Sequence, residues 1–482
     1  MELSSVLLRI GIYDMNRRSF IKRLGVGMAS LALPPLLNAK DSKRPNVLFI
    51  CVDDMNDWVA CLKGRSDIKT PHIDRLAKRG VLFTNAHCPA PLCNPCRTAI
   101  MTGLRPGTTG IYNNKGVWAK QMPKWVTLPR HFKNNGYHVA GGGKIYHHTP
   151  KGFNPKDQWH EYFDLIMDQG TQAEHVRHLG LNREYFSDMP EHPNGSWDWG
   201  PFQKDDYEMG DGHTTKWAME FLGRKHEKPF FLAVGLFQPH LPFYAPAKYF
   251  DQYPKESIAM PPAPEDDLDD LPPAATDVAK AGRDKKFKMV AECGQLRPAV
   301  QGYLSSIAHA DALIGGLLSA LDKSPYGNNT VIVFWSDHGY HFGEKQRMAK
   351  RSLWERATRV PLIVVAPGIT KPGSRCGRAV DLMSIYPTLA ELCGLPTRKK
   401  NDGVSIVPLL KDPAAKWNHA AITTHTRGSH AVRSERWRYI RYANGDEELY
   451  DHKADPNEWH NLADSAEHAS IKKKMARWLP KG

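Results

Sequence analysis

Short apolar runs, separated by amphipathic stretches, constrain the fold of this 482-residue chain more than any other feature. Four of them have the length of strands: Asn46–Val52, Pro229–Phe237, Thr330–Trp335 and Pro361–Ala366. Strands with little polar alternation are typical of sheets that are covered on both faces. Helical patterns flank these runs, at Thr70–Arg79, Pro298–Leu321 and Ser384–Leu392. We therefore predict an α/β fold, with a large, mostly parallel or mixed sheet sandwiched by helices.

The texture of the sequence changes after Pro396. Four short strand-like runs follow, at Ala420–Thr424, Ser429–Arg433, Trp437–Tyr442 and Glu448–Tyr450, and then a basic helical segment near Ile471–Trp478. Short runs at this spacing predict a small antiparallel sheet. We divide the chain into an N-terminal segment (1–39), a main domain (40–395) and a C-terminal subdomain (396–482). A stretch rich in Pro and Asp, at 253–277, predicts a long surface loop.

The first 39 residues have the pattern of an export signal. The paired Arg17 and Arg18 precede a short apolar stretch, Leu24–Leu37, which ends next to the small residue Ala39. This order is typical of twin-arginine signals, although a basic surface helix is an alternative. We expect export by the twin-arginine machinery to the periplasm or the extracellular space, and we expect no membrane span.

The chain is basic. Its formal net charge is +14; residues 1–39 hold five basic and two acidic groups, so the rest of the chain carries +11. A basic surface attracts anionic partners, of which nucleic acid and sulfated polysaccharide are two, but it is also common on soluble proteins. The sequence holds no zinc-finger, RNA-recognition or basic-helix motif, so a nucleic-acid partner is not expected.

Polar residues follow two of the apolar runs directly. Asp53 and Asp54 come after Val52, and Asp337 and His338 come shortly after Trp335. Ligand sites in open α/β sheets lie beyond the carboxyl ends of strands. Either pair alone could be a turn or a helix cap. Together they offer three carboxylates and an imidazole, a mainly oxygen-donor set that favours Ca²⁺ or Mg²⁺ over zinc.

The segment Cys93–Gly103 is the most informative part of the sequence. Cys93 opens a predicted helix, and Arg97 lies one turn further along the same face. From the residues alone, Cys93 could be a thiolate activated by the helix N-terminus, or it could form a redox pair with Cys96. The surrounding pattern matches the catalytic helix of a thioredoxin-like fold poorly.

Cys93-x-Pro95-x-Arg97, followed by Thr98-x-x-x-Thr102-Gly103, resembles the signature of the formylglycine-dependent sulfatases of the alkaline phosphatase superfamily. Further matches follow the order of that family and extend from Arg44 to Leu462: Asp53-Asp54, Gly143–His147, Gln238–His240, Asp337-His338, Lys350 and Glu448–Asp451. Arg105–Thr109, and Lys350 before Val360–Leu362, look most like the iduronate-2-sulfatase branch. The resemblance implies an alkaline phosphatase-like fold and a sulfuric ester hydrolase.

The resemblance also implies a role for each matched residue. Cys93 would be oxidised to formylglycine (3-oxoalanine) by a formylglycine-generating enzyme, and its hydrate would be the nucleophile. The modified Cys93 would join four other residues in binding Ca²⁺, with Mg²⁺ as an alternative: Asp53, Asp54, Asp337 and His338. Arg97 would stabilise the hydrated aldehyde, and Lys144 and Lys350 would neutralise sulfate oxygens. His147, or the adjacent His148, would accept a proton from the second hydroxyl, and His240 would protonate the leaving alcohol.

The implied substrate is a sulfated carbohydrate, and two alternatives stay open. A phosphonate monoester or phosphodiester hydrolase of the same superfamily would share the motif. A non-catalytic, metal-bound protein that binds sulfated glycans is less favoured, because every catalytic position is filled. Cys96 occupies a free position of the motif and is predicted to be a packed residue without a catalytic role.

Overall fold

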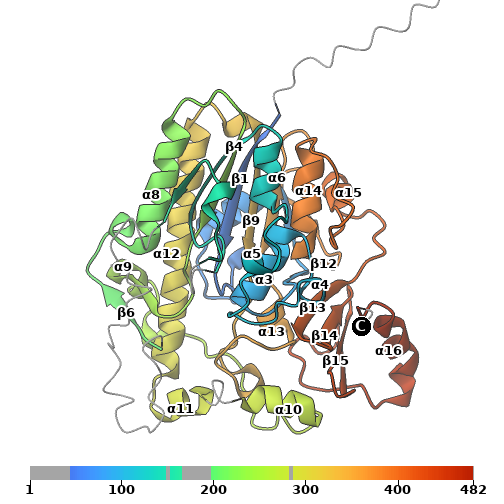
Figure 1. The fold of residues 1–482 in the computed structure, drawn as a ribbon. Coiled ribbons are helices and arrows are strands. Elements are labelled where there is room, and N and C mark those ends of the chain that lie inside the picture. The colour runs from blue at the N-terminus through green and yellow to red at the C-terminus, as the bar shows by residue number, and fades with distance from the viewer. Residues whose placement is uncertain (1–43, 148–151, 165–196, 282–285, 481–482) are drawn as a thin grey trace, which may run out of the picture. The chain divides into compact units, whose positions relative to one another are not determined.

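A computed structural model describes residues 44–147, 152–164, 197–281 and 286–480 (Figure 1). The predicted export signal and His148 lie outside the described residues. The centre of the fold is an eight-stranded sheet in the order β11-β2-β10-β9-β1-β7-β4-β5. In that order its strands are Ser374–Cys376, Val81–Phe83, Leu362–Val365, Thr330–Ser336, Asn46–Val52, Phe230–Gly235, His138–Gly143 and Glu161–Phe163. All four runs that the sequence predicted as strands are strands of this sheet.

The sheet is mixed, with a parallel centre. β1 pairs in parallel with β7 on one side and with β9 on the other. β10 runs antiparallel to both of its neighbours, β9 and β2, so the sheet is not parallel throughout. Every residue of β1 and β9 is buried, because helices cover both faces. The predicted fold class is therefore confirmed.

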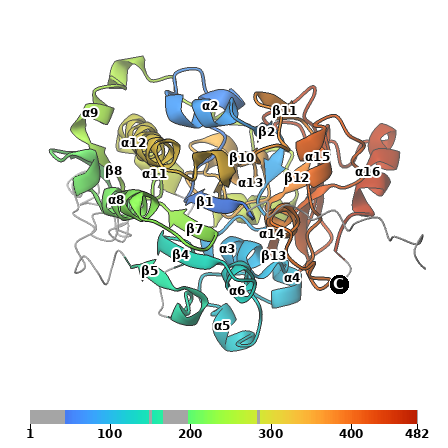
Figure 2. The same ribbon diagram turned by 90° about the horizontal axis from the view of Figure 1, so that it is seen from above.

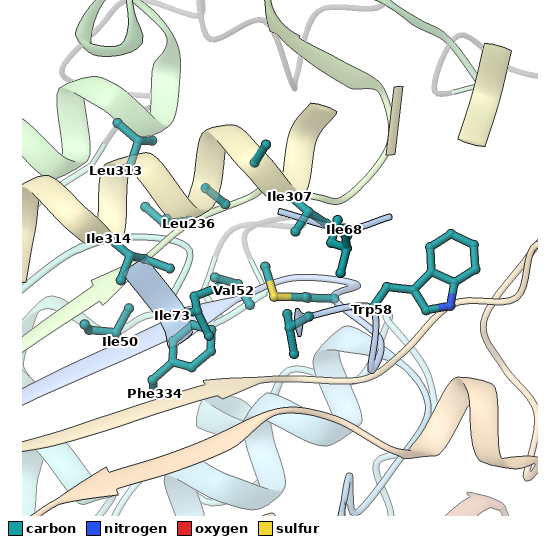
Figure 3. Packing of buried hydrophobic residues seen from close by; sticks show 14 of the residues in the cluster. Ile50, Val52, Trp58, Ile68, Ile73, Leu236, Ile307, Leu313, Ile314 and Phe334 are labelled. Atoms are coloured by element: carbon teal, nitrogen blue, oxygen red, sulfur yellow. The ribbon is translucent and has the colours of Figure 1, made fainter. Parts of the chain in front are cut away.

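Two groups of helices cover the sheet (Figure 2). One face carries α2 (Pro71–Ala77), α8 (Gly210–Gly223) and α12 (Leu296–Lys323), and the other carries α3 (Cys93–Thr102), α6 (Leu128–Asn134) and α14 (Ile385–Leu392). Figure 3 shows Ile307 and Ile314 of α12 facing Ile50, Val52 and Phe334 of the sheet. The predicted helices coincide with α2, α12 and α14 to within a few residues.

By length and composition alone, α12 could cross a membrane. However, 78% of its most apolar window is buried inside the fold, where it contacts β8 (Phe243–Pro246) as well as α8 and α2. That burial is typical of a core helix.

The predicted antiparallel sheet near the C-terminus is present. β13 (Ala421–Thr426), β14 (Ser429–Arg433), β15 (Trp437–Arg441) and β16 (Glu447–Asp451) pair in sequence order, and α16 (Ala469–Ala476) packs beside them. α15 (Val407–Lys411) contributes its apolar residues to the core cluster that contains α3, α6 and α14. The boundary between main domain and subdomain near residue 396 stays a prediction.

Shorter elements connect these layers. They include β3 (Ala86–His87), β6 (Trp199–Phe202), β12 (Val380–Asp381), α4 (Pro106–Thr109), α5 (Trp118–Gln121), α9 (Ala247–Phe250), α10 (Pro273–Lys280), α11 (Lys286–Glu292) and α13 (Glu355–Thr358). The predicted surface loop at 253–277 is irregular as far as Pro272, apart from one short 3-10 turn, and α10 begins at Pro273.

Candidate active site and metal site

The ends of two adjacent strands bring the four predicted metal ligands together. Val52 and Ser336 are paired in the parallel register of β1 and β9, so Asp53-Asp54 and Asp337-His338 leave the sheet side by side. The Asp54 N–H donates to Oδ1 of Asp337 at 3.2 Å, and the Asp337 carboxylate also accepts the His338 N–H at 2.9 Å. The short spacing between parallel strands makes this proximity a direct consequence of register.

Cys93, the first residue of α3, points at these carboxylates. Its Sγ lies 3.4 Å from Oδ1 of Asp53, 3.3 Å from Nε2 of His338 and 3.3 Å from Nζ of Lys350. Burial raises the pKa of the Cys93 thiol to about 12, so the unmodified residue is a neutral thiol. The structure thus gives no support to the activated thiolate that the helix N-terminus alone suggested.

Arg97 lies fully buried one turn after Cys93. Its Nε donates to Oδ2 of Asp337 at 2.8 Å, and its terminal nitrogens donate to the backbone carbonyls of Val52 and Lys144. These bonds tie α3 to the ends of β1, β9 and β4 at once. Arg97 therefore fixes the position of Cys93 relative to the carboxylates, in addition to any direct role.

Two lysines complete the charge balance. Lys144, directly after β4, pairs with Oδ2 of Asp53, and Nζ of Lys350 lies 2.7 Å from Oδ1 of Asp54. With Arg97, the site holds three buried carboxylates and three basic side chains. Burial and the neighbouring Lys350 lower the pKa of Lys144 to about 7. Adding a divalent cation to this balanced set leaves a positive centre, which suits a tetrahedral anion.

His240 stands on the open side of the site. Its Nε2 lies 3.8 Å from Oδ2 of Asp54, and its side chain is 28% exposed, against 1% for Asp54. Burial and the nearby Lys350 and Lys144 hold the pKa of His240 well below its usual range. A general-acid role therefore requires that the negative charge of a bound sulfate ester raise this pKa again. Asp211 of α8 holds the preceding turn, because its carboxylate accepts the Phe237 and Gln238 N–H groups at 2.9 and 2.8 Å.

Two other predicted residues have different outcomes. His147 is half-buried just beyond Lys144, where its ring packs edge-on against Phe153 at 5.3 Å, and its expected role at Cys93 stays a prediction. Cys96 is fully buried, and its Sγ donates to the Asp337 carbonyl. Cys93 and Cys96 are both free thiols, which agrees with a packing role for Cys96.

The donor set fits a hard divalent cation. Single ligand atoms from Asp53, Asp54, Cys93 and His338 all lie within 4.8 Å of one another, and all four residues are buried. Asp337 adjoins them: its Oδ2 accepts a hydrogen bond from Arg97 and its Oδ1 accepts two backbone N–H groups, which leaves lone pairs on both oxygens for a cation. Two of the four ligand atoms are carboxylate oxygens, and Asp337 beside them is a third carboxylate; Ca²⁺ and Mg²⁺ prefer such oxygen donors. If an oxygen atom replaced the sulfur of Cys93, the site would gain a further oxygen donor.

Tyr303 is a contributor that the sequence did not reveal. Asp54 adopts a left-handed backbone conformation with φ of 66°, which is strained for a residue with a side chain. The buried Tyr303 hydroxyl bridges both sides of it, because it donates to the Asp54 carbonyl at 2.7 Å and accepts the Asn56 N–H at 3.0 Å. A tyrosine within an apolar helix is normally part of the core, so no sequence signal marks this role.

We expect Tyr303→Phe to weaken metal binding by about 10- to 100-fold, as is typical when a partner that orients a ligand is removed. The variant leaves the ring in place but releases the strained turn that orients Asp54. Calcium titration followed by calorimetry measures the effect. Tyr340→Phe is the matched control, because its hydroxyl lies in the same aromatic cluster but donates to the Met348 carbonyl. Equal calcium affinities in the two variants would contradict the role.

Together, an α/β sheet with buried carboxylates, paired cations and a cysteine at one edge defines a hydrolase site for a tetrahedral anion. Comparison with known proteins identifies the class: the chain belongs to the sulfatase family, whose "Sulfatase" family profile matches residues 45–395. A second profile, "N-sulphoglucosamine sulphohydrolase, C-terminal", matches residues 343–481. The resemblance inferred from the motif is confirmed, and the protein is a sulfuric ester hydrolase.

Similar proteins support this assignment along most of the chain. A "Sulfatase" of Formosa agariphila is 40% identical over 92% of this chain and 87% of its own length. The human iduronate 2-sulfatase is 32% identical over 73% of this chain and 69% of its own length. Among solved structures, a 2-O GAG sulfatase aligns with a TM-score of 0.67 at 21% identity, covering 90% of this chain and 91% of its own. A phosphonate monoester hydrolase of Agrobacterium radiobacter aligns with a TM-score of 0.71 at 22% identity, covering 90% and 94%, which shows a shared fold.

Proposed function

We propose that this sulfatase uses a formylglycine made from Cys93, together with Ca²⁺, to remove sulfate from a sulfated carbohydrate. The observation that carries the proposal is the position of Cys93. Its Sγ lies within 3.4 Å of a carboxylate, an imidazole and a lysine, at the start of a helix whose next turn supplies Arg97. A neutral, deeply buried thiol with these neighbours is a poor nucleophile, whereas an oxygen nucleophile there would face both the metal ligands and the lysines.

In the proposed reaction, each residue of the site has a separate role. The hydrated aldehyde would supply the attacking oxygen, and the S–O ester bond would break as the alcohol leaves with a proton from His240. A Ca²⁺ ion would be held by Asp53, Asp54, Asp337 and His338, and it would polarise a sulfate oxygen. Lys144 and Lys350 stabilise the negative charge that grows on the sulfate oxygens in the transition state. Arg97 holds residue 93 in position. His147 accepts a proton from the second hydroxyl of the hydrated residue, which allows sulfate to leave and the aldehyde to re-form.

A carbohydrate substrate is supported by three features of the chain. The predicted export signal would place the enzyme where environmental polysaccharides occur. The basic charge of +11 outside that signal favours an anionic polymer. Similar proteins include the human iduronate 2-sulfatase and an ulvan-active sulfatase of Formosa agariphila, although a choline-sulfatase also belongs to the group.

We also propose that a formylglycine-generating enzyme modifies Cys93 and that the twin-arginine machinery exports the chain. Recovery of the modified protein from the periplasmic fraction tests both proposals.

Mass spectrometry and a substrate panel test the proposed function. The peptide that contains Cys93, taken from active protein, should have the mass of an aldehyde or its hydrate in place of a thiol. The panel should contain sulfated sugars, aryl sulfates, choline sulfate and phosphonate monoesters. We expect the enzyme to turn over sulfated sugars faster than every other substrate of the panel. Preference for phosphonate esters, or full activity with an unmodified cysteine, would refute the proposal.

His240→Ala tests whether His240 protonates the leaving group. A sugar alkoxide is a poor leaving group and needs a proton, whereas a nitrophenolate hardly does. We therefore expect the substitution to lower kcat by about 10²- to 10⁴-fold on sulfated sugars and by much less on an aryl sulfate. Steady-state kinetics on both substrates measures the ratio. Equal losses on the two would remove His240 as the general acid.

A further inference from the structure

Arg351 lies at the edge of the active site in an unusual conformation. It directly follows Lys350, whose Nζ contacts Cys93 and Asp54. Its backbone N–H donates to the Pro91 carbonyl at 3.1 Å, only two residues before Cys93. Its φ of 66° lies in the left-handed region, where non-glycine residues are uncommon and are enriched at functional sites. Arg351 therefore has a strained backbone that directly follows Lys350 and is hydrogen-bonded to the loop before Cys93.

The guanidinium of Arg351 has no hydrogen-bond or ion-pair partner within the described part of the chain, although the residue is half-buried. Nearby arginines differ in this respect. Arg347 donates to the Lys350 carbonyl at 2.8 Å, and Arg356 and Arg359 both pair with Asp57. A guanidinium that has lost part of its hydration and gains no partner is costly, and the planar group is shaped to bind a carboxylate or sulfate with two hydrogen bonds.

A second donor comes to the same place from the C-terminal sheet. The Thr424 N–H donates to the Pro89 carbonyl at 2.9 Å, and the Thr423 hydroxyl donates to the Cys88 carbonyl at 2.6 Å, so the end of β13 lies on the loop that leads to Cys93. The next residue, His425, is half-buried, and its imidazole likewise forms no hydrogen bond or ion pair with another described residue. Burial, with Arg347 and Arg351 nearby, lowers the pKa of His425 to about 4, so it is a neutral donor at pH 7.

The β13–β14 hairpin is held firmly in this position. Arg433 of β14 and Arg438 of β15 both pair with Glu355 of α13, only four residues after Arg351. The segments that carry Arg351 and His425 are therefore both anchored to the loop before Cys93, at Pro91 and Pro89, and this arrangement exists before a ligand arrives.

We propose that Arg351 and His425 form a second anion subsite, which binds a carboxylate or a further sulfate group of the substrate while its scissile sulfate ester lies at Cys93. This inference rests on the proposed function and narrows it. The substrate would be a sugar that carries two anionic groups, on one unit or on neighbouring units. A charged guanidinium and a neutral imidazole N–H are complementary to either group, since both present several acceptor oxygens.

The test compares singly and doubly anionic substrates. We expect Arg351→Gln to raise KM by about 10- to 100-fold on a sulfated uronate disaccharide or a disulfated disaccharide, as the loss of a charge-assisted hydrogen bond implies. The effect on an aryl sulfate should be at least tenfold smaller. Arg351→Lys should recover part of the affinity, and His425→Gln should shift KM in the same direction as Arg351→Gln. Arg75→Gln makes the same charge change on an exposed residue of α2 and should leave every KM unaltered.

Each outcome of the kinetic test either supports the anion subsite or overturns it. A larger effect on the uronate disaccharide identifies a carboxylate as the ligand, and a larger effect on the disulfated one identifies a sulfate. Equal losses on all substrates, or a wild-type preference for monosulfated neutral sugars, would overturn the subsite and leave the sulfatase function intact. Failure of the wild-type enzyme on every sulfated sugar would instead overturn the carbohydrate function on which the subsite rests.

Discussion

Replacing Cys93 by alanine is expected to lower kcat on any sulfate ester by about 10⁴-fold or more, the size of effect that follows loss of a covalent nucleophile. The reason is positional: Cys93 alone among the residues of α3 contacts Asp53, His338 and Lys350 together. Steady-state kinetics with a sensitive aryl sulfate gives the measurement. Cys93→Ser should be similarly impaired where the maturation enzyme accepts only cysteine, since a serine hydroxyl is not an aldehyde hydrate.

Cys96→Ala provides the matched control. It removes a second buried thiol from the same helix, but that thiol donates only to the Asp337 backbone carbonyl. We expect its kcat to stay within about tenfold of the wild type, because the lost contact is a single weak hydrogen bond. Thermal unfolding of both variants separates folding from chemistry. Substantial turnover by Cys93→Ala, or an equal loss in Cys96→Ala, would argue against a nucleophile at position 93.

Removal of the metal should have the second largest effect. Exhaustive chelation is expected to lower activity by at least about 10³-fold, because the polarising cation and the orientation of the buried carboxylates are lost together. Calcium should restore activity, and elemental analysis should find one calcium ion for each chain. Chelation should also lower the unfolding temperature, because a ligand that binds only the folded state stabilises it.

Two variants locate the ion. Asp54→Asn removes a charge from the proposed site and should abolish stoichiometric calcium. His452→Gln is the control, since Glu355, His452 and Glu458 form another group whose ligand atoms are close enough to hold a metal. Arg433 and Arg438 already neutralise that group, so it should bind no ion, and the control should retain its calcium. Stoichiometric zinc, or full activity after chelation, would contradict the assignment.

Much of the fold was predictable because the pattern of neighbouring residues in the sequence indicates where its strands and helices lie. Asn46–Val52 is a strand from end to end as predicted, since a buried parallel strand shows an unbroken apolar run. The residues that follow such strands were predictable for the same reason: the register of β1 and β9 necessarily places Asp53 beside Asp337. The C-terminal strands were found from their short, regular spacing. Element ends were less certain, as in α10, whose start at Pro273 lies within the predicted loop.

The supporting residues were not predictable. Tyr303 and Asp211 are distant in sequence from the groups that they hold, and their helical surroundings mark them only as core positions. Arg351 is one of many basic residues in the sequence, and nothing local shows that its backbone is left-handed or that its side chain has no partner among the described residues. Such features depend on contacts between segments that meet only after folding.

The sequence by itself determined the class of fold, the order of the motif residues and, through the pattern around Cys93, the family. These depend on periodicity and on residue types at fixed spacing, both of which are local properties. Only the tertiary structure decided which carboxylate faces which cation, how Asp54 is held in a strained turn, and that the end of β13 lies on the loop before Cys93. Those relations depend on register and packing between segments that are distant in the sequence, by 91 residues for Lys144 and Asp53 and by 296 for Lys350 and Asp54, and small displacements decide whether polar groups meet.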